Sequence, residues 1–353
     1  MVYPKAMTQQ SVGTLDNPGT GRWFTVPGPF RSVLFAAKAI AEDTVGFRFA
    51  YPIQIVPEAG PRESLHYYIY SDRLFFNAME LDDEGVPYQR ARLLGKFYNP
   101  AYIAWYGLMK LEQSLQFGRN SSAEFETQFH WLVKHAVRQA DRSVVWHFPV
   151  DHVEGKCNLK APWISVMIQG LALSVLVRAH RLGFRNIDLM ELCRSATMVY
   201  SRTIEQGGVR TLEDGHVSYE EYPGYPLARV LDGSLFGLLG LYDLWVETQD
   251  NDVKRLFEEG IDGLSHTIHV WNFKNNWSWY GSHGYLCPPH YHTLNRMLLT
   301  AVAAVSANER LASQAALWNP DGLTPPQRAR VFLLFVWLKQ WSRLRALLRR
   351  FSA

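Results

Sequence analysis

The segment SYEEYPGYPLARVLDGSLFGLLGLYDL, residues 218–244, joins a polar, aromatic loop to an apolar run long enough for a helix of several turns. Two glutamates and three tyrosines lie between residues 219 and 225. Charged groups usually lie in water and phenols are often half-buried, so one interpretation is a solvated helix entry with aromatic packing. The other is a loop that carries catalytic groups on a rigid helical support. Composition alone leaves both interpretations open.

The apolar spacing around this segment predicts a largely helical chain. Before about residue 90, proline and glycine separate short aromatic runs such as SLHYYIYS (64–71), which is typical of strands and turns. Loops between the later helices are alternately short and long, as in a succession of helical hairpins. We therefore predict a mainly α protein, with a smaller β-rich N-terminal region (1–90) and an α/α toroid (91–353) whose inner helices line a cleft. The predicted helices cover 98–115, 122–140, 163–183, 187–206, 229–249, 251–270, 291–307 and 327–350.

Composition excludes several classes of function. The chain has 353 residues, of which 47% are hydrophobic and 20% charged, as in a globular protein with an ample core. A net charge of +3 is too small to indicate a nucleic-acid partner, although it suits an anionic substrate. The three widely spaced cysteines imply no disulfide framework and favour a reducing compartment. No signal peptide or membrane-spanning stretch is visible in the sequence, so we expect a cytoplasmic protein.

The C-terminal segment QRARVFLLFVWLKQWSRLRALLRRFSA (327–353) is basic and amphipathic. One interpretation is a helix lying on an anionic membrane surface, which would make a membrane a peripheral partner. The favoured interpretation is a closing helix that packs its apolar face on the toroid and leaves its arginines outside.

The motifs of the sequence favour proton transfer over metal or covalent chemistry. CPPHYHT (287–293) offers Cys287, His290 and His292 as zinc ligands, but no second ligand pair stands at motif spacing, so we expect no metal. Glycine-rich phosphate loops and a serine nucleophile elbow are absent from the sequence. Carboxylates, phenols and imidazoles on loops remain, and these groups suit general acid and base catalysis.

Five blocks of the sequence carry a family resemblance. They are EGVPYQRARLLGKFYNPAYIAWYGL (84–108), APWISVMIQGLALSVLVRAHRLG (161–183), YEEYP (219–223), VLDGSLFGLLGLYDL (230–244) and YHTLNRMLL (291–299). In that order they resemble the heparosan/heparan sulfate D-glucuronyl C5-epimerase family.

The resemblance implies a β-rich N-terminal part, an α/α toroid and no metal or organic cofactor. It also implies an anionic polysaccharide substrate in which D-glucuronate is inverted at C5 to L-iduronate, and it leaves a homodimer open. The C5 hydrogen is a very weak acid, so the reaction needs a positioned base, stabilisation of the resulting enolate and a proton donor on the opposite face.

The resemblance also implies which residues are catalytic. Tyr222 and Tyr291 correspond to tyrosines of the family's E-Y-P and Y-H motifs, and we assign them as opposed proton-transfer groups. Glu221 is a candidate base or a partner that deprotonates the phenol, and Tyr280 is a further active-site tyrosine. Because a free phenol has a pKa of about 10, a tyrosine acting as a base would need a cationic neighbour. Each of these residues also has an alternative interpretation as packing or as a helix-entry charge.

Substrate binding is assigned less directly, because the chain departs from the family pattern. Asp232 stands where the family has an asparagine, and His283 where the animal enzymes have an arginine. Arg296 is one candidate to hold the substrate carboxylate in its place, and Arg229 is another. The remaining substrate-binding candidates are His292 beside Tyr291, Gln169 in MIQGL, and Tyr98 in the upstream block. These departures keep two other functions open, namely a uronan lyase and a non-catalytic glycan-binding protein.

Overall fold

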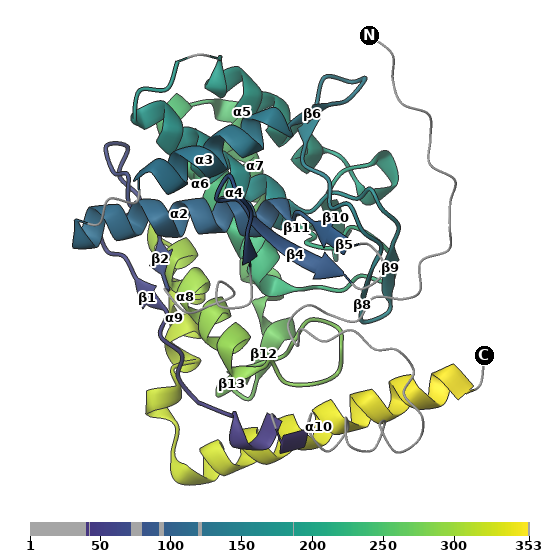
Figure 1. The fold of residues 1–353 in the computed structure, drawn as a ribbon. Coiled ribbons are helices and arrows are strands. Elements are labelled where there is room, and N and C mark those ends of the chain that lie inside the picture. The colour runs from purple at the N-terminus through teal and green to yellow at the C-terminus, as the bar shows by residue number, and fades with distance from the viewer. Residues whose placement is uncertain are drawn as a thin grey trace.

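The computed structural model of this protein describes residues 40–41, 43–71, 80–91, 95–118, 122–185 and 187–351 (Figure 1). Most of these residues are helical, as predicted, and the strands form small sheets of two or three strands. Part of the predicted β-rich region, residues 1–39, lies outside the described residues.

Each predicted helix is present, but three details differ. The helix predicted over 122–140 ends at Lys134, and Val137–Arg138 forms a strand instead. The stretch predicted as one helix over 187–206 forms a helix only to Thr197 and continues as two short 3-10 turns. The helix Glu309–Leu317 was not predicted. The helices are α2 (Pro100–Phe117), α3 (Ser122–Lys134), α4 (Val166–Arg181), α5 (Leu189–Thr197), α6 (Leu231–Thr248), α7 (Asn251–Thr267), α8 (Pro289–Ser306), α9 (Glu309–Leu317) and α10 (Pro325–Phe351).

The helices pair into consecutive hairpins along the chain. Helices α2, α4, α6 and α8 pack successively against one another and form an inner row. Each of them also packs against the helix that follows it, so that α3, α5, α7 and α9 lie outside the row. Closure of this row into a toroid stays a prediction.

The strands are short antiparallel pairs, and many of them lie between helices rather than in the N-terminal region. β1 pairs with β2, and both contact α8. The hairpins after α3 and α5 were not predicted. The strands are β1 (Gln54–Ile55), β2 (Ile69–Tyr70), β3 (Glu80–Leu81), β4 (Pro87–Ala91), β5 (Gly95–Phe97), β6 (Val137–Arg138), β7 (Val144–Val145), β8 (His152–Glu154), β9 (Cys157–Leu159), β10 (Arg210–Glu213), β11 (His216–Tyr219), β12 (Asn272–Phe273) and β13 (Trp277–Ser278).

A buried ion pair joins the N-terminal residues to the inner helices. Arg178 on α4 donates to Asp243 on α6 over 2.6 Å, and neither side chain is more than 2% exposed. The same guanidinium donates to the carbonyl oxygens of Leu65 and His66. A buried charge is tolerated only when it is paired and hydrogen-bonded, so this network attaches the segment before β2 to α4 and α6.

Glycines allow α4 and α6 to approach closely. A Cβ atom added at Gly170 of α4 would lie 2.3 Å from the carbonyl oxygen of Phe236. A Cβ atom added at Gly240 of α6 would lie 2.3 Å from the carbonyl oxygen of Gly170. Because both obstacles are backbone atoms, the helices themselves would have to separate to admit a side chain.

We therefore expect Gly170→Ala to lower the free energy of unfolding by about 2 kcal/mol or more, as overpacking does in tight cores. Gly322→Ala is the matched control, because no atom of the described residues lies within 4 Å of the added carbon there. Chemical denaturation of both variants measures the difference. Equal stability of the two variants would contradict the close contact between α4 and α6.

Candidate active site

One pocket lies at the N-terminal ends of all four inner helices. Its enclosed volume is about 50 Å³, and the space rises to about 600 Å³ when the solvent at its open mouth is included. Residues from the first turns or the caps of α2, α4, α6 and α8 contribute to its wall. The lining residues are Asn99, Ala101, Tyr102, Phe148, His152, Trp163, Ser165, Met167, Ile168, Glu221, Tyr222, Val230, Asp232, Tyr280 and Tyr291.

These helix starts give the pocket a favourable field for an anion. The side chains of Asn99 and Ser165 cap α2 and α4 by accepting backbone N–H groups. Neither Val230 before α6 nor Pro288 before α8 supplies a side-chain cap. The N-terminal end of a helix carries partial positive charge, so the four helix starts contribute a field that favours an anionic group in the pocket.

Two buried carboxyl groups lie side by side in the wall. Glu221 and Asp232 are 7% and 4% exposed, and among the described residues Glu221 Oε2 and Asp232 Oδ1 have no hydrogen-bond partner. A Cβ atom at Gly233 would lie 2.4 Å from Glu221 Cβ, so this glycine makes room for the glutamate. Burial raises the pKa of Asp232 to about 7. Burial and the charge of Asp232 raise the pKa of Glu221 well above its usual range.

The buried environment of Asp232 explains how an aspartate can stand where the family pattern has an asparagine. A carboxyl group with a pKa near 7 is protonated in part of the population at neutral pH. In that form it donates a hydrogen bond, as an asparagine amide does. The substitution therefore retains a donor in the wall and makes it dependent on pH.

Three predicted tyrosines lie on the same pocket. The rings of Tyr280 and Tyr291 are 5.4 Å apart, and Tyr222 forms a hydrogen bond with Glu221. Burial, followed by neighbouring negative charges such as that of Glu221, raises the pKa of Tyr222 well above 10. Burial likewise raises the pKa values of Tyr280 and Tyr291. These phenols are therefore neutral at physiological pH and can donate protons, contrary to the expectation of a phenol activated by a nearby cation.

A histidine–glutamate–histidine cluster packs against two of these tyrosines. Glu154 Oε2 is 3.0 Å from His152 Nε2, and Glu154 Oε1 is 2.6 Å from His283 Nε2. Although burial opposes it, hydrogen bonding from the two imidazoles lowers the pKa of Glu154 to about 2. The His152 ring stacks on Tyr222 at 4.9 Å, and His283 packs on Tyr280 at 4.7 Å. Glu154 thus holds both imidazoles against candidate catalytic tyrosines.

Two predicted substrate-binding residues lie in the core instead of the pocket. His292 is fully buried, accepts from the backbone N–H of Ser278 and contacts the carbonyl of Trp318. Burial lowers its pKa to about 3, so it is a neutral structural histidine. Gln169 is also fully buried and donates to the carbonyls of Val144 and Ala196. Neither side chain is placed to touch a substrate.

Outside the pocket wall there are also three further predicted binding residues, Tyr98, Arg296 and His283. The Tyr98 hydroxyl donates to Asp82 Oδ2 over 2.6 Å, in a separate groove that also contains Lys96 and Trp131. Arg296 is half-buried on α8 and is absent from the pocket wall. Arg229, the alternative cation, pairs with Glu213 over 2.6 Å. His283 reaches the site only through Glu154 and Tyr280, as described above.

Several residues of the pocket were not predicted from the sequence. Tyr102, Asn99 and Ser165 stand at helix starts, and the cap signals Asn-Pro and Ser before an apolar run were visible in the sequence. His152 and Glu154 lie on β8, a three-residue strand with no signal of its own.

The described residues also contain a surface group with metal-ligand spacing, at a different place from the CPPHYHT motif. It consists of His216 on β11 with Asp262 and His266 on α7. The two imidazole rings stack at 3.7 Å and both contact the aspartate. It belongs to the outer surface and not to the pocket.

The fold and the pocket define a class of protein: stacked helical hairpins whose inner helices present buried carboxyl and phenol groups suited to moving a proton to or from carbon. A family model described as D-glucuronyl C5-epimerase C-terminus matches residues 140–320, just over half of the sequence. The chain therefore belongs to the D-glucuronyl C5-epimerase family, which confirms the resemblance seen in the sequence.

Two relatives place this match in context. The chain is 28% identical over 237 residues to the D-glucuronyl C5-epimerase of Caenorhabditis elegans, covering 61% of this chain and 38% of that protein. It is 23% identical over 182 residues to an uncharacterised protein of Methanocaldococcus jannaschii, covering 47% of this chain and 58% of that protein. The chain thus spans less than two thirds of the length of either relative.

Proposed function

We propose that the protein is a uronosyl C5-epimerase that converts D-glucuronate to L-iduronate within a heparosan-like polysaccharide. The observation that carries the proposal is the meeting of Glu221, Tyr222 and Tyr291 on one pocket beneath four helix N-termini. Membership of the D-glucuronyl C5-epimerase family supports the same reaction.

Proton removal is assigned to Tyr222 and Glu221 acting together. The neutral Tyr222 phenol is hydrogen-bonded to Glu221, whose pKa is raised by burial. As the Tyr222 oxygen takes the C5 proton, the phenolic proton passes to the Glu221 carboxylate. The electron pair of the broken C–H bond moves into the substrate carboxyl group and forms an enolate, which the partial positive charge of the helix starts stabilises.

Reprotonation is assigned to Tyr291, which reaches the pocket from α8 while Tyr222 comes from the loop after β11. Its phenolic proton is transferred to C5 from the opposite face and inverts the centre. The protonated Glu221 and the Tyr291 phenolate then exchange protons with solvent before the next turnover. The reverse reaction uses the two groups in exchanged roles.

Incubation of heparosan with the protein in deuterated water tests the proposal. Deuterium at C5 in chains of unchanged length, together with new iduronate, is the expected result. Unsaturated, ultraviolet-absorbing chain ends would instead indicate a lyase, because elimination begins with the same proton abstraction. Binding of heparosan without exchange or cleavage would indicate a glycan-binding protein that has no activity on the polymer.

The buried carboxyl pair makes the reaction dependent on pH. The carboxylate form of Glu221 must be present, and the pKa values of Glu221 and Asp232 are both raised. The rate of C5 exchange should therefore increase as the pH rises through the raised pKa of Glu221. In Asp232→Asn the neighbouring charge is gone, so the pKa of Glu221 falls and the profile should shift to lower pH with activity retained. An unshifted pH profile would show that the charge of Asp232 does not control the pKa of Glu221.

A further inference from the structure

Helix α10 has one face packed on the protein. Val331 and Phe335 are buried, Lys339 Nζ lies 3.9 Å from the centre of the Tyr285 ring, and Arg343 pairs with Asp43 over 2.5 Å. This packing is what a closing helix requires. The opposite face of α10 takes no part in this packing.

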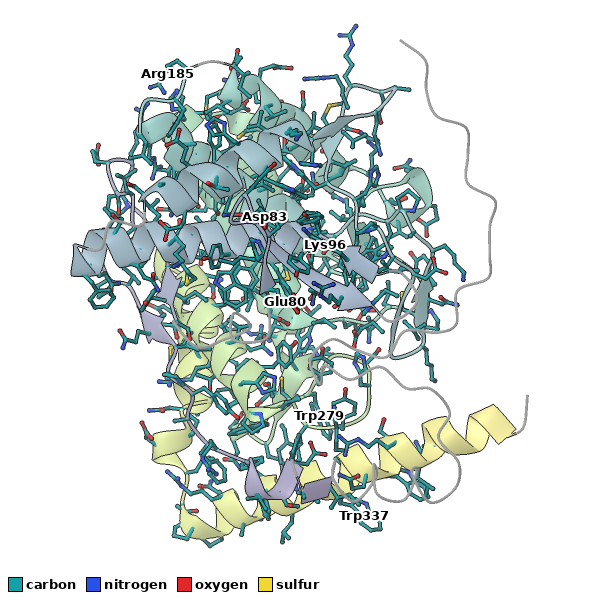
Figure 2. All side chains as sticks on the ribbon, viewed as in Figure 1. Glu80, Asp83, Lys96, Arg185, Trp279 and Trp337 are labelled. Atoms are coloured by element: carbon teal, nitrogen blue, oxygen red, sulfur yellow. The ribbon has the colours of Figure 1, made fainter. Side chains whose placement is uncertain are left out.

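The opposite face carries an exposed apolar stripe. Leu333, Trp337, Trp341 and Leu344 are 63%, 66%, 42% and 44% exposed. Their spacing of four, four and three residues puts them on one side of the helix. The two indole rings are nearly parallel and stacked, with an interplanar angle of 3° and centres 6.5 Å apart. Figure 2 shows Trp337 on the side of α10 that points away from the other helices.

The charge of α10 has a single sign. Residues 325–351 include no aspartate or glutamate, whereas arginine and lysine recur throughout. Among the described side chains, Arg330 and Arg345 are exposed near the two ends of the stripe. The Arg345 guanidinium lies 5.1 Å from the centre of the Trp341 ring. The exposed face of α10 therefore combines leucine, paired tryptophan and arginine, and the helix itself contributes no acidic group.

We propose that this face of α10 docks on the surface of an anionic lipid bilayer, with the helix lying in the plane of the interface. Tryptophan concentrates at the boundary between lipid headgroups and acyl chains, and exposed leucine gains from entering the acyl region. Arginine next to the stripe is attracted by anionic headgroups. Tryptophan alone also suits a sugar platform, but Leu333 and Leu344 at the ends of the stripe offer nothing to a hydrophilic polysaccharide.

A helix that lies in the plane of the membrane surface, and does not cross it, also fits the length and polarity of the helices. Within the part of the chain that the structure describes, no helix is long and apolar enough to cross a membrane. The contact is thus peripheral, it depends on salt, and it brings a pocket for a soluble polymer to a membrane surface. It does not depend on the proposed reaction.

Flotation of the full chain with lipid vesicles tests the docking. We expect binding to vesicles of phosphatidylcholine with 30% phosphatidylglycerol, weak binding to pure phosphatidylcholine, and release at about 0.5 M salt because that concentration screens surface charge. Trp337→Ser with Trp341→Ser should weaken binding about tenfold or more, and Arg330→Gln with Arg345→Gln should reduce it mainly on the anionic vesicles.

Leu212→Ser is the matched control, since Leu212 is 61% exposed on β10, and it should bind vesicles as the unmodified chain does. Thermal denaturation verifies that every variant is folded. Absence of vesicle binding by the unmodified chain would overturn the proposal. So would a double tryptophan variant that binds vesicles normally but loses self-association in sedimentation, or loses affinity for heparosan, because the stripe would then be a dimer interface or a glycan platform.

Discussion

Tyr222→Phe is expected to reduce C5 deuterium exchange at least about a thousandfold, within the range that general acid or base catalysis contributes. The change deletes one oxygen, keeps the ring that stacks on His152, and removes the hydrogen bond to Glu221. The proton then has no path from C5 to the buried carboxylate. Nuclear magnetic resonance of heparosan incubated in deuterated water measures the loss.

Tyr225→Phe is the control for this result. Tyr225 lies three residues later on the same loop, but it is 57% exposed and absent from the pocket wall. It should exchange deuterium at the rate of the unmodified protein. Full activity in Tyr222→Phe would remove this tyrosine from the reaction, whereas equal losses in both variants would indicate a disturbed loop.

The periodicity of the sequence predicted the helices well because each long helix buries a continuous apolar face. The prediction was wrong where buried apolar residues continue along the chain but the backbone is not α-helical. After Thr197 the chain keeps burying residues such as Tyr200, but it does so from 3-10 turns. Helix α9 has only nine residues. The hairpins after α3 and α5 have strands of two to four residues. Segments this short do not repeat a hydrophobic pattern often enough to reveal its period.

In the site, too, residues that are adjacent in the sequence need not be neighbours in space, and distant residues can meet. Motif adjacency placed Tyr291 and His292 together, yet neighbouring residues on a helix point about 100° apart. Tyr291 therefore faces the pocket while His292 faces the core. Conversely, Glu154 and His283 are far apart in the sequence and meet only because β8 and the loop before α8 come together. No spacing rule could anticipate that contact.

Glu221→Gln is expected to reduce C5 exchange at least about a hundredfold, because the amide keeps the shape of the side chain but cannot take the proton relayed through Tyr222. Loss of activity should not come with loss of stability. The pKa of Glu221 is raised in the folded protein, so its contribution to stability is lost as pH rises through that value. At pH 8 the variant should therefore unfold at a temperature equal to or above that of the unmodified protein.

The neighbouring glutamate provides a close comparison. Glu220 is also buried, and burial raises its pKa to about 7, but its Oε2 accepts from the backbone N–H of Arg229 and it is absent from the pocket wall. Glu220→Gln retains an oxygen for that hydrogen bond, so it should match Glu221→Gln in its effect on stability at pH 8 while keeping C5 exchange. Both variants being inactive would mean that burial of charge in the loop matters more than the base. Both being active would assign proton removal to another group, and the pair Glu221–Asp232 would then serve only to hold the substrate.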